Sequence, residues 1–131
     1  YDQLRQLFAR STFFWHAAGM GEDEARHPEK FEHFGITTVE AMAAGCVPIV
    51  INKGGQREII RDKIDGYLFD SLDQLKQITL DAVQGRLDLK LVADRARERA
   101  QMFSSQNFSQ KLLKIVQDYL RHGSEHNNRK L

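Results

Sequence analysis

Residues 38–51, with the sequence TVEAMAAGCVPIVI, decide the fold. Residues 38–44 favour a helix, and Gly45 can end it because glycine adopts the left-handed conformation without a steric penalty. The nearly all-apolar run at residues 47–51 is typical of a strand in a parallel sheet that is covered on both faces. A helix that leads directly into such a strand predicts an alternating α/β architecture.

Two further runs extend this pattern. Residues 12–16, TFFWH, are β-branched and aromatic and predict a buried strand, with Phe14 and Trp15 in the core. Residues 66–69, GYLF, predict a third strand. Parallel strands joined through helices imply right-handed crossovers. We therefore expect an α/β fold that is the second half of a Rossmann-like parallel sheet, with about three strands, flanked by helices and followed by C-terminal helices.

The apolar spacing elsewhere predicts helices, which we place at residues 1–10, 56–62, 71–83, 88–103 and 107–121. The end of the chain is polar, so we expect residues 122–131 to be a disordered tail. Residues 1–121 then form one partial domain. Because the chain opens at Tyr1 in what reads as the middle of a helix, we expect it to be a fragment of a longer protein.

Composition limits the classes of function. The chain has 131 residues, 41% hydrophobic and 28% charged, which suits one globular domain. A net charge of +1 gives no electrostatic reason to expect a nucleic acid partner. Cys46, the single cysteine, fits a buried free thiol. No run approaches the roughly 20 apolar residues of a membrane span, so we expect a cytoplasmic protein, with peripheral membrane attachment left open.

A group of residues at one edge of the predicted sheet indicates a ligand-binding site. Ligands of such sheets bind beyond the carboxyl ends of the strands, where the loop 17–36 and the turn 52–55 should line one crevice. Within residues 32–42, EHFGITTVEAM, two glutamates flank a glycine and a helix N-terminus. Such a terminus can bind phosphate, and carboxylates can accept hydrogen bonds from sugar hydroxyls. Phosphate and polyol together describe a nucleotide sugar.

Each of these residues could also have a purely structural role. Thr37 and Glu40 have the spacing of a capping box, in which threonine caps the helix and glutamate bonds back to it. Glu32 on its own fits a solvated loop charge. His16 fits a satisfied histidine at a strand end, although it could also reach a ligand in the crevice.

The run at residues 32–50, EHFGITTVEAMAAGCVPIV, resembles the signature of glycosyltransferase family 4. That pattern is Glu, any residue and Phe-Gly, then Glu-Ala-Met-Ala, Gly and Pro, an apolar strand, and Gly-Gly followed by Glu-Ile. Gly54-Gly55 and Glu58-Ile59 supply its last part. Members are retaining enzymes of the GT-B fold, with two Rossmann-like domains and the donor in the C-terminal one. The resemblance covers about residues 1–70 and, more loosely, the helices to residue 121.

The resemblance implies a role for particular residues and favours ligand binding over capping for Glu40. Glu32 would be the catalytic residue, bonding donor-sugar hydroxyls near the anomeric centre, and Glu40 would bind the ribose hydroxyls. The donor-binding set implied in this way is His16, Glu32, Phe34, Gly35, Ile36, Thr37, Glu40 and Gly55. The donor would be a UDP-, GDP- or ADP-sugar, with no cofactor and no metal.

The resemblance also implies that parts of the enzyme are missing. By comparison with the family, we expect this chain to lack the first strands of the donor domain, with their basic pair for the diphosphate, and the N-terminal domain that binds the acceptor. We therefore expect this fragment to transfer no sugar alone, and residues 12–16 to be an exposed sheet edge that invites association. The helix at residues 107–121 would be detached or packed on a neighbour.

Other functions stay open. One alternative is a non-catalytic nucleotide-sugar-binding domain, and others are a nucleotide-dependent dehydrogenase, epimerase or phosphorylase on a similar sheet. The Gly-x-Gly-x-x-Gly motif of a dehydrogenase is absent from the chain. The Glu-Ala-Met-Ala run favours the transferase over the epimerase and the phosphorylase.

Overall fold

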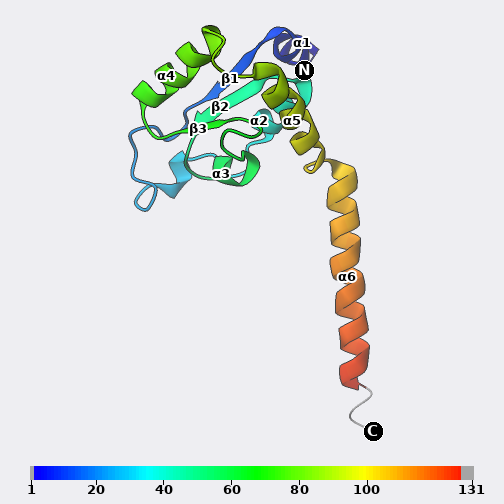
Figure 1. The fold of residues 1–131 in the computed structure, drawn as a ribbon. Helices are drawn as coiled ribbons and strands as arrows, with labels where there is room; N and C mark the ends of the chain where they lie inside the picture. The colour runs from blue at the N-terminus through cyan, green and yellow to red at the C-terminus, as the bar shows by residue number, and fades with distance from the viewer. Residues whose placement is uncertain (1, 128–131) are drawn as a thin grey trace. The chain divides into compact units, whose positions relative to one another are not determined.

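Three parallel strands form one open sheet in the computed structural model, which describes residues 2–127. The strands are β1 (Phe13–His16), β2 (Val47–Ile51) and β3 (Tyr67–Phe69), and they lie side by side in chain order (Figure 1). In the register, Trp15 lies opposite Ile49 and Val50 opposite Leu68. The sheet confirms the predicted α/β class and its strand number.

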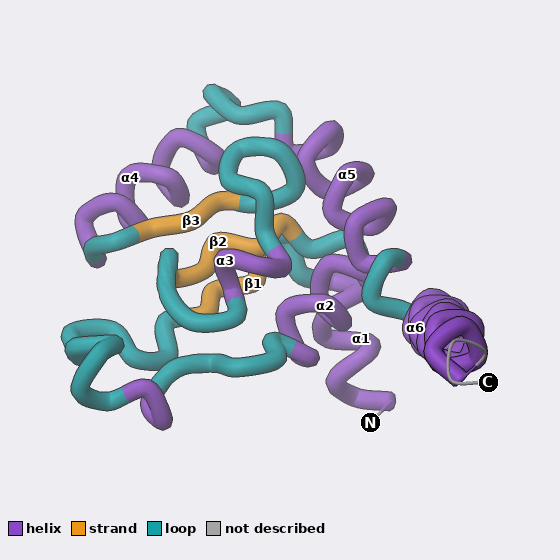
Figure 2. Tube along the Cα trace, turned by 90° about the horizontal axis from the view of Figure 1, so that it is seen from below, coloured by secondary structure: helices purple, strands orange, loops and turns teal. Residues whose placement is uncertain are grey.

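Helices precede or follow every strand. Their bounds are α1 (Asp2–Arg10), α2 (Ile36–Ala44), α3 (Gln56–Ile59), α4 (Leu72–Val83), α5 (Leu89–Gln101) and α6 (Ser105–Asn127), with a short 3₁₀ helix at Pro28–Lys30. Seen from below, α4 lies next to β3, and α1 and α2 lie towards β1 (Figure 2). The unit of residues 1–100 holds all three strands.

The core has one layer on each face of the sheet, and β2 contributes to both. Val50 packs with Met42, Ile59 and Ala96 on one face. The other face gathers residues from β2, β3 and α5, namely Val47, Ile49, Ile51, Tyr67, Phe69 and Val92. Because successive strand residues point to opposite faces, a central strand covered on both sides must be apolar throughout. This explains the run at residues 47–51.

The prediction that Trp15 lies in the core is wrong, because the residue is 57% exposed. Phe14 packs against the core on one face, but Trp15 points to the opposite face at an edge strand. On that face α4 packs against β3, at the other edge of the sheet from Trp15. The sheet edge predicted at residues 12–16 is thus confirmed within the described sheet, while association through it stays a prediction.

Two glycines set the limits of α2. Gly35 precedes the helix in the left-handed conformation, with φ of 61°. Gly45 follows it with φ of 95°, and its amide donates to the carbonyls of Ala41 and Met42, so the predicted C-terminal cap is confirmed. Cys46 comes next and is buried, as predicted, with its thiol donating to the Phe8 carbonyl at 3.2 Å.

Helix α3 is shorter than predicted. It ends at Ile59 rather than residue 62, because Ile60 turns extended with ψ of 128°. The Arg99 guanidinium of α5 donates to the carbonyls of Glu58 (2.7 Å) and Ile59 (3.0 Å). Those two carbonyls therefore have a partner from another helix where the chain leaves the helical conformation.

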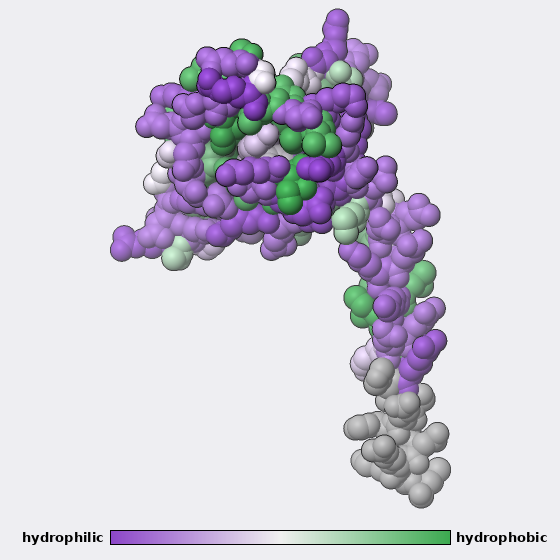
Figure 3. All heavy atoms as spheres, viewed as in Figure 1, coloured by the Kyte–Doolittle hydropathy of each residue, from purple (hydrophilic) through white to green (hydrophobic). Residues whose placement is uncertain are grey.

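Residues 101–131 form a second compact unit. Its helix α6 exposes large apolar side chains among polar ones (Figure 3): Phe108, Leu112, Leu113, Ile115, Val116, Tyr119 and Leu120. The helix continues through Asn127, into the segment predicted to be a tail, and residues 128–131 lie outside the described residues. Among the helices that the structure describes, none has the length and apolar character needed to span a membrane.

Candidate functional site

The candidate site lies where the chain leaves the carboxyl ends of β1 and β2. His16 is the last residue of β1, and the loop after it runs to the N-terminus of α2. The turn at residues 52–55 leaves from β2, and the Gly55 amide donates to the Glu32 carbonyl at 2.7 Å. Added Cβ atoms at Gly54 and Gly55 would lie only 2.5 Å and 2.3 Å from backbone carbonyl oxygens of the loop. Loop and turn are therefore in direct main-chain contact.

Glu32 is held at the start of α2 by its own neighbours. Its Oε1 accepts hydrogen bonds from the amides of Phe34 and Gly35, both at 3.0 Å. Its Oε2 lies 3.7 Å from Nε2 of His16. The Gly35 amide and then the Phe34 amide lower the pKa of this carboxyl below its ordinary value of 4.5, so Glu32 is ionised at neutral pH.

The N-terminus of α2 presents its amides beside this carboxylate. The amides of Ile36 and Thr37 belong to the first turn, where no intrahelical acceptor exists. Phe34 and Ile36 are 82% and 68% exposed, so solvent reaches this end of the helix. Gly35 is required here, because its φ is positive and an added Cβ would lie 2.2 Å from Cδ1 of Ile59.

The capping-box interpretation of Thr37 and Glu40 is wrong. The cap residue is Gly35, and no side chain caps the helix. Since the left-handed glycine starts the helix one residue before Thr37, the threonine lies within the first turn rather than ahead of it. Glu40 is consequently in the second turn, beyond the reach of a capping interaction.

Two buried side-chain nitrogen atoms in this region have no hydrogen-bond partner: Nδ1 of His16, which is a half-buried residue, and Nε2 of Gln56. Burial lowers the pKa of His16, with the nearby Glu32 charge acting in the opposite direction. The imidazole is therefore neutral at pH 7. Gln56 is fully buried, and its Oε1 accepts a hydrogen bond from Thr38 Oγ1 at 3.0 Å. Gln56 was not predicted as a site residue, because its position after Gly54-Gly55 does not indicate a buried side chain.

Glu40 faces a different feature, a hollow of about 460 Å³ between α1 and α2. Its walls are mainly apolar, with Arg5 as the second charged side chain, and they comprise Leu4, Arg5, Phe8, Ala9, Glu40, Ala43 and Ala44. No other member of the predicted donor-binding set lines this hollow. The structure thus brings His16, Glu32 and the amides at Phe34 and Gly35 together with Gly55, and turns Glu40 towards α1.

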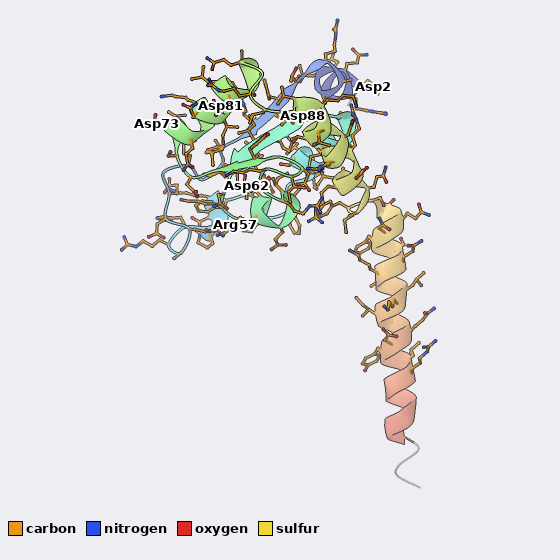
Figure 4. All side chains as sticks on the ribbon, in the orientation of Figure 1. Asp2, Arg57, Asp62, Asp73, Asp81 and Asp88 are labelled. Carbon is orange, nitrogen blue, oxygen red and sulfur yellow. The ribbon has the colours of Figure 1, made fainter. Side chains whose placement is uncertain are left out.

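The loop also carries a charged network that sequence reasoning did not single out. Oε1 of Glu24 accepts from the Gly54 amide at 2.8 Å and from Nη2 of Arg57 at 2.5 Å. Lys53 Nζ donates to the Glu22 carbonyl at 2.8 Å. Arg57 lies on α3, on the side of the loop (Figure 4). In sequence these acids look like ordinary solvated loop charges, and only the fold reveals their partners.

The fold and site define a Rossmann-like parallel α/β unit, with an acidic side chain over a helix N-terminus at the carboxyl edge of the sheet. The chain belongs to the family Glycosyl transferases group 1, whose model matches residues 1–100. This confirms the family predicted from residues 32–59.

Similar proteins agree with that assignment. Over 128 residues the chain is 30% identical to the GDP-Man:Man(3)GlcNAc(2)-PP-Dol alpha-1,2-mannosyltransferase of Dictyostelium discoideum, covering 97% of this chain and 23% of that protein. Over 98 residues it is 31% identical to sucrose synthase of Beta vulgaris, covering 70% of this chain and 13% of that protein. The chain therefore spans less than a quarter of the length of either relative.

Solved structures agree on the fold. The crystal structure of Anabaena Alr3699/HepE in complex with UDP-glucose matches with a TM-score of 0.69 at 21% identity, covering 88% of this chain and 30% of that one. Sucrose-phosphate synthase from Thermosynechococcus elongatus matches with a TM-score of 0.58 at 21% identity, covering 71% of this chain and 24% of that one. At this identity the likeness establishes the GT-B type of fold.

Proposed function

We propose that this chain is the donor-binding part of a retaining glycosyltransferase that transfers a sugar from a nucleoside diphosphate sugar to an acceptor held by another part of the complete protein. Family membership supports sugar transfer. The donor class is supported by two similar proteins, one named for GDP-Man and one crystallised with UDP-glucose.

One observation carries the proposal: the Glu32 carboxylate lies on the Phe34 and Gly35 amides at the start of α2, beside His16. A carboxylate already bonded to these two amides demonstrates that they can hold an anionic oxygen. The nearby amides of Ile36 and Thr37, together with the helix dipole, favour negative charge at the same point. A diphosphate or a sugar oxygen of the donor would bind there.

Glu32 would change partners when the donor binds. An oxygen that takes the amides of Phe34 and Gly35 displaces Oε1, and the released carboxylate can accept hydrogen bonds from sugar hydroxyls near the anomeric carbon. His16 is neutral at pH 7 and lies 3.7 Å from Oε2, so it can donate to or accept from the same sugar. The backbone amides and the α2 dipole would stabilise negative charge on the leaving diphosphate.

Glu40 would bind the ribose hydroxyls from the mouth of the hollow between α1 and α2. A hydrogen bond to a charged acceptor contributes about 1.5–3 kcal/mol. The donor would then extend from the Glu32 side of the helix N-terminus to the Glu40 side.

A thermal-shift panel on the complete protein that contains this chain tests the proposal. UDP-, GDP- and ADP-sugars are compared with NADH at equal concentrations, because a ligand that binds the native state raises the melting temperature. We expect at least one nucleotide sugar to stabilise the protein, and sugar transfer to retain the anomeric configuration. Stabilisation by NADH and by no nucleotide sugar would contradict the proposal.

A further inference from the structure

We propose that Glu24 is a positioning residue that fixes the Gly54-Gly55 turn beneath Glu32 and so sets the place of the Glu32 carboxylate. The inference rests on the proposed function of Glu32, but the contact that it invokes can be tested without any ligand. Glu24 belongs to no motif of the family pattern quoted above.

The turn is pressed against the main chain that carries Glu32. Gly55 donates its amide to the Glu32 carbonyl at 2.7 Å, and an added Cβ at Gly54 would lie 2.5 Å from the same carbonyl oxygen. A shift of the turn must therefore move the backbone of Glu32, because no flexible side chain lies between them. Oε1 of Glu32, in turn, reaches amides only two and three residues along the same chain.

The second half of the turn has no side chains to hold it, since residues 54 and 55 are both glycine. Glu24 supplies the missing anchor from 30 residues away, accepting from the Gly54 amide at 2.8 Å. The guanidinium of Arg57, one turn further along the chain on α3, fixes the same carboxylate oxygen at 2.5 Å. Glu24 is thus held between the turn and the helix that follows it.

Lys53 ties the turn to the loop from its other end. Its Nζ donates to the Glu22 carbonyl at 2.8 Å and lies 5.3 Å from the centre of the Phe31 ring, which is buried. The Glu22 carboxylate in turn pairs with Lys30 at 2.7 Å. Side chains therefore join the loop and the turn at two points, Lys53 and Gly54. The contact that Glu24 makes is the one at Gly54, the residue that lies against the Glu32 carbonyl.

Four variants of the complete protein test the proposal in transfer assays: Glu24→Ala, Glu24→Gln, Glu32→Gln and the double variant Glu24→Ala/Glu32→Gln. Glu29→Ala is the matched control, because Glu29 is on the same loop, 67% exposed, and pairs with His27. We expect Glu24→Ala to lower kcat about tenfold with a smaller change in KM, and Glu24→Gln to restore most of it because its amide oxygen still accepts from Gly54. Since Glu24 acts through Glu32, the double variant should fall well short of the product of the two single losses.

Hydrogen–deuterium exchange of residues 52–57 in the absence of ligand tests the anchor itself. Glu24→Ala should exchange the Gly54 amide faster than wild type and Glu29→Ala. Unchanged exchange in Glu24→Ala would overturn the proposal, and so would a double variant whose loss equals the full product. If the wild-type protein binds no nucleotide sugar, the proposed function fails, while the exchange result still decides whether Glu24 holds the turn.

Discussion

The two acidic side chains that we propose bind the donor lie in very different surroundings. Glu32 is held by main-chain amides, and the main chain that carries it lies against a Gly-Gly turn. Glu40 lies on the wall of a hollow built from side chains of α1 and α2. The first region is made of backbone in contact with backbone, and the second of side chains whose size and polarity can vary without moving a helix.

This difference suggests a division of labour within the proposed site. A backbone framework offers the same donors whatever the side chains are, which suits an oxygen present in every nucleotide sugar. A side-chain hollow can be altered one residue at a time, which suits recognition of the part that differs between donors. The predictions below test the two regions against each other.

The largest effect is expected at Glu32. Glu32→Gln removes the negative charge and leaves the shape, so we expect kcat/KM of the complete protein to fall about 100-fold, from the loss of charged hydrogen bonds in the transition state. Steady-state kinetics with the preferred donor measures this. Glu29→Gln is the matched control, with the same change of charge on the same loop. Equal activity of the two variants would remove Glu32 from the chemistry.

Glu40→Gln should act on binding rather than on chemistry. Losing one charged acceptor for the ribose hydroxyls should weaken donor binding by about one to two powers of ten, with a smaller change in kcat. Isothermal titration with the donor measures the Kd, and Asp73→Asn on the exposed surface of α4 is the control. A loss confined to kcat would erase the proposed contrast between the two acids.

Gly55→Ala tests the backbone framework directly. Gly55 has φ of −65°, which alanine tolerates, so the clash of Cβ with the His33 carbonyl oxygen at 2.3 Å is isolated from backbone strain. We expect a loss of about 1–3 kcal/mol in the free energy of unfolding, measured by urea denaturation. Gly85→Ala is the opposite control, with positive φ and open space around Cβ. If Gly55→Ala is as stable as wild type, the turn does not confine Glu32.

The smallest effect concerns pH. The backbone amides lower the pKa of Glu32 below 4.5 in the folded state, so the ionised carboxylate stabilises the fold above that pH. This contribution is lost as the pH falls through the lowered pKa. An NMR titration of the Glu32 side-chain carboxyl should give a midpoint below 4.5. A midpoint at or above this value would mean that the two amides do not hold the carboxylate in solution.

Much of the fold could be predicted from the sequence because its signals are local. The apolar run at residues 47–51, the glycine at the end of α2 and the aromatic strand before the loop each fix an element. Trp15 was misplaced because exposure at a sheet edge depends on which elements cover each face, and residues 12–16 alone do not contain that information. The end of α3 was misplaced because Arg99, 40 residues away, binds its carbonyls.

The candidate site was less predictable. Its motif residues could be named, since their spacing is local, but the partner of each carboxylate could not. Nothing in the sequence indicates that Glu32 bonds to amides two and three residues ahead, or that Glu40 turns towards α1. Glu24 was passed over because an acidic residue in a charged loop looks the same whether or not an amide from a distant turn meets it.

The hydrogen bonds of Glu32 have a consequence for how donor affinity should be understood. A donor oxygen that binds the Phe34 and Gly35 amides must first displace the Glu32 carboxylate from them. A measured Kd then reports an exchange of one negatively charged group for another, not the full strength of the incoming one. Modest affinity would be a sign of this competition rather than of a poor fit, and departure of the spent nucleotide would be assisted by the carboxylate returning to its amides.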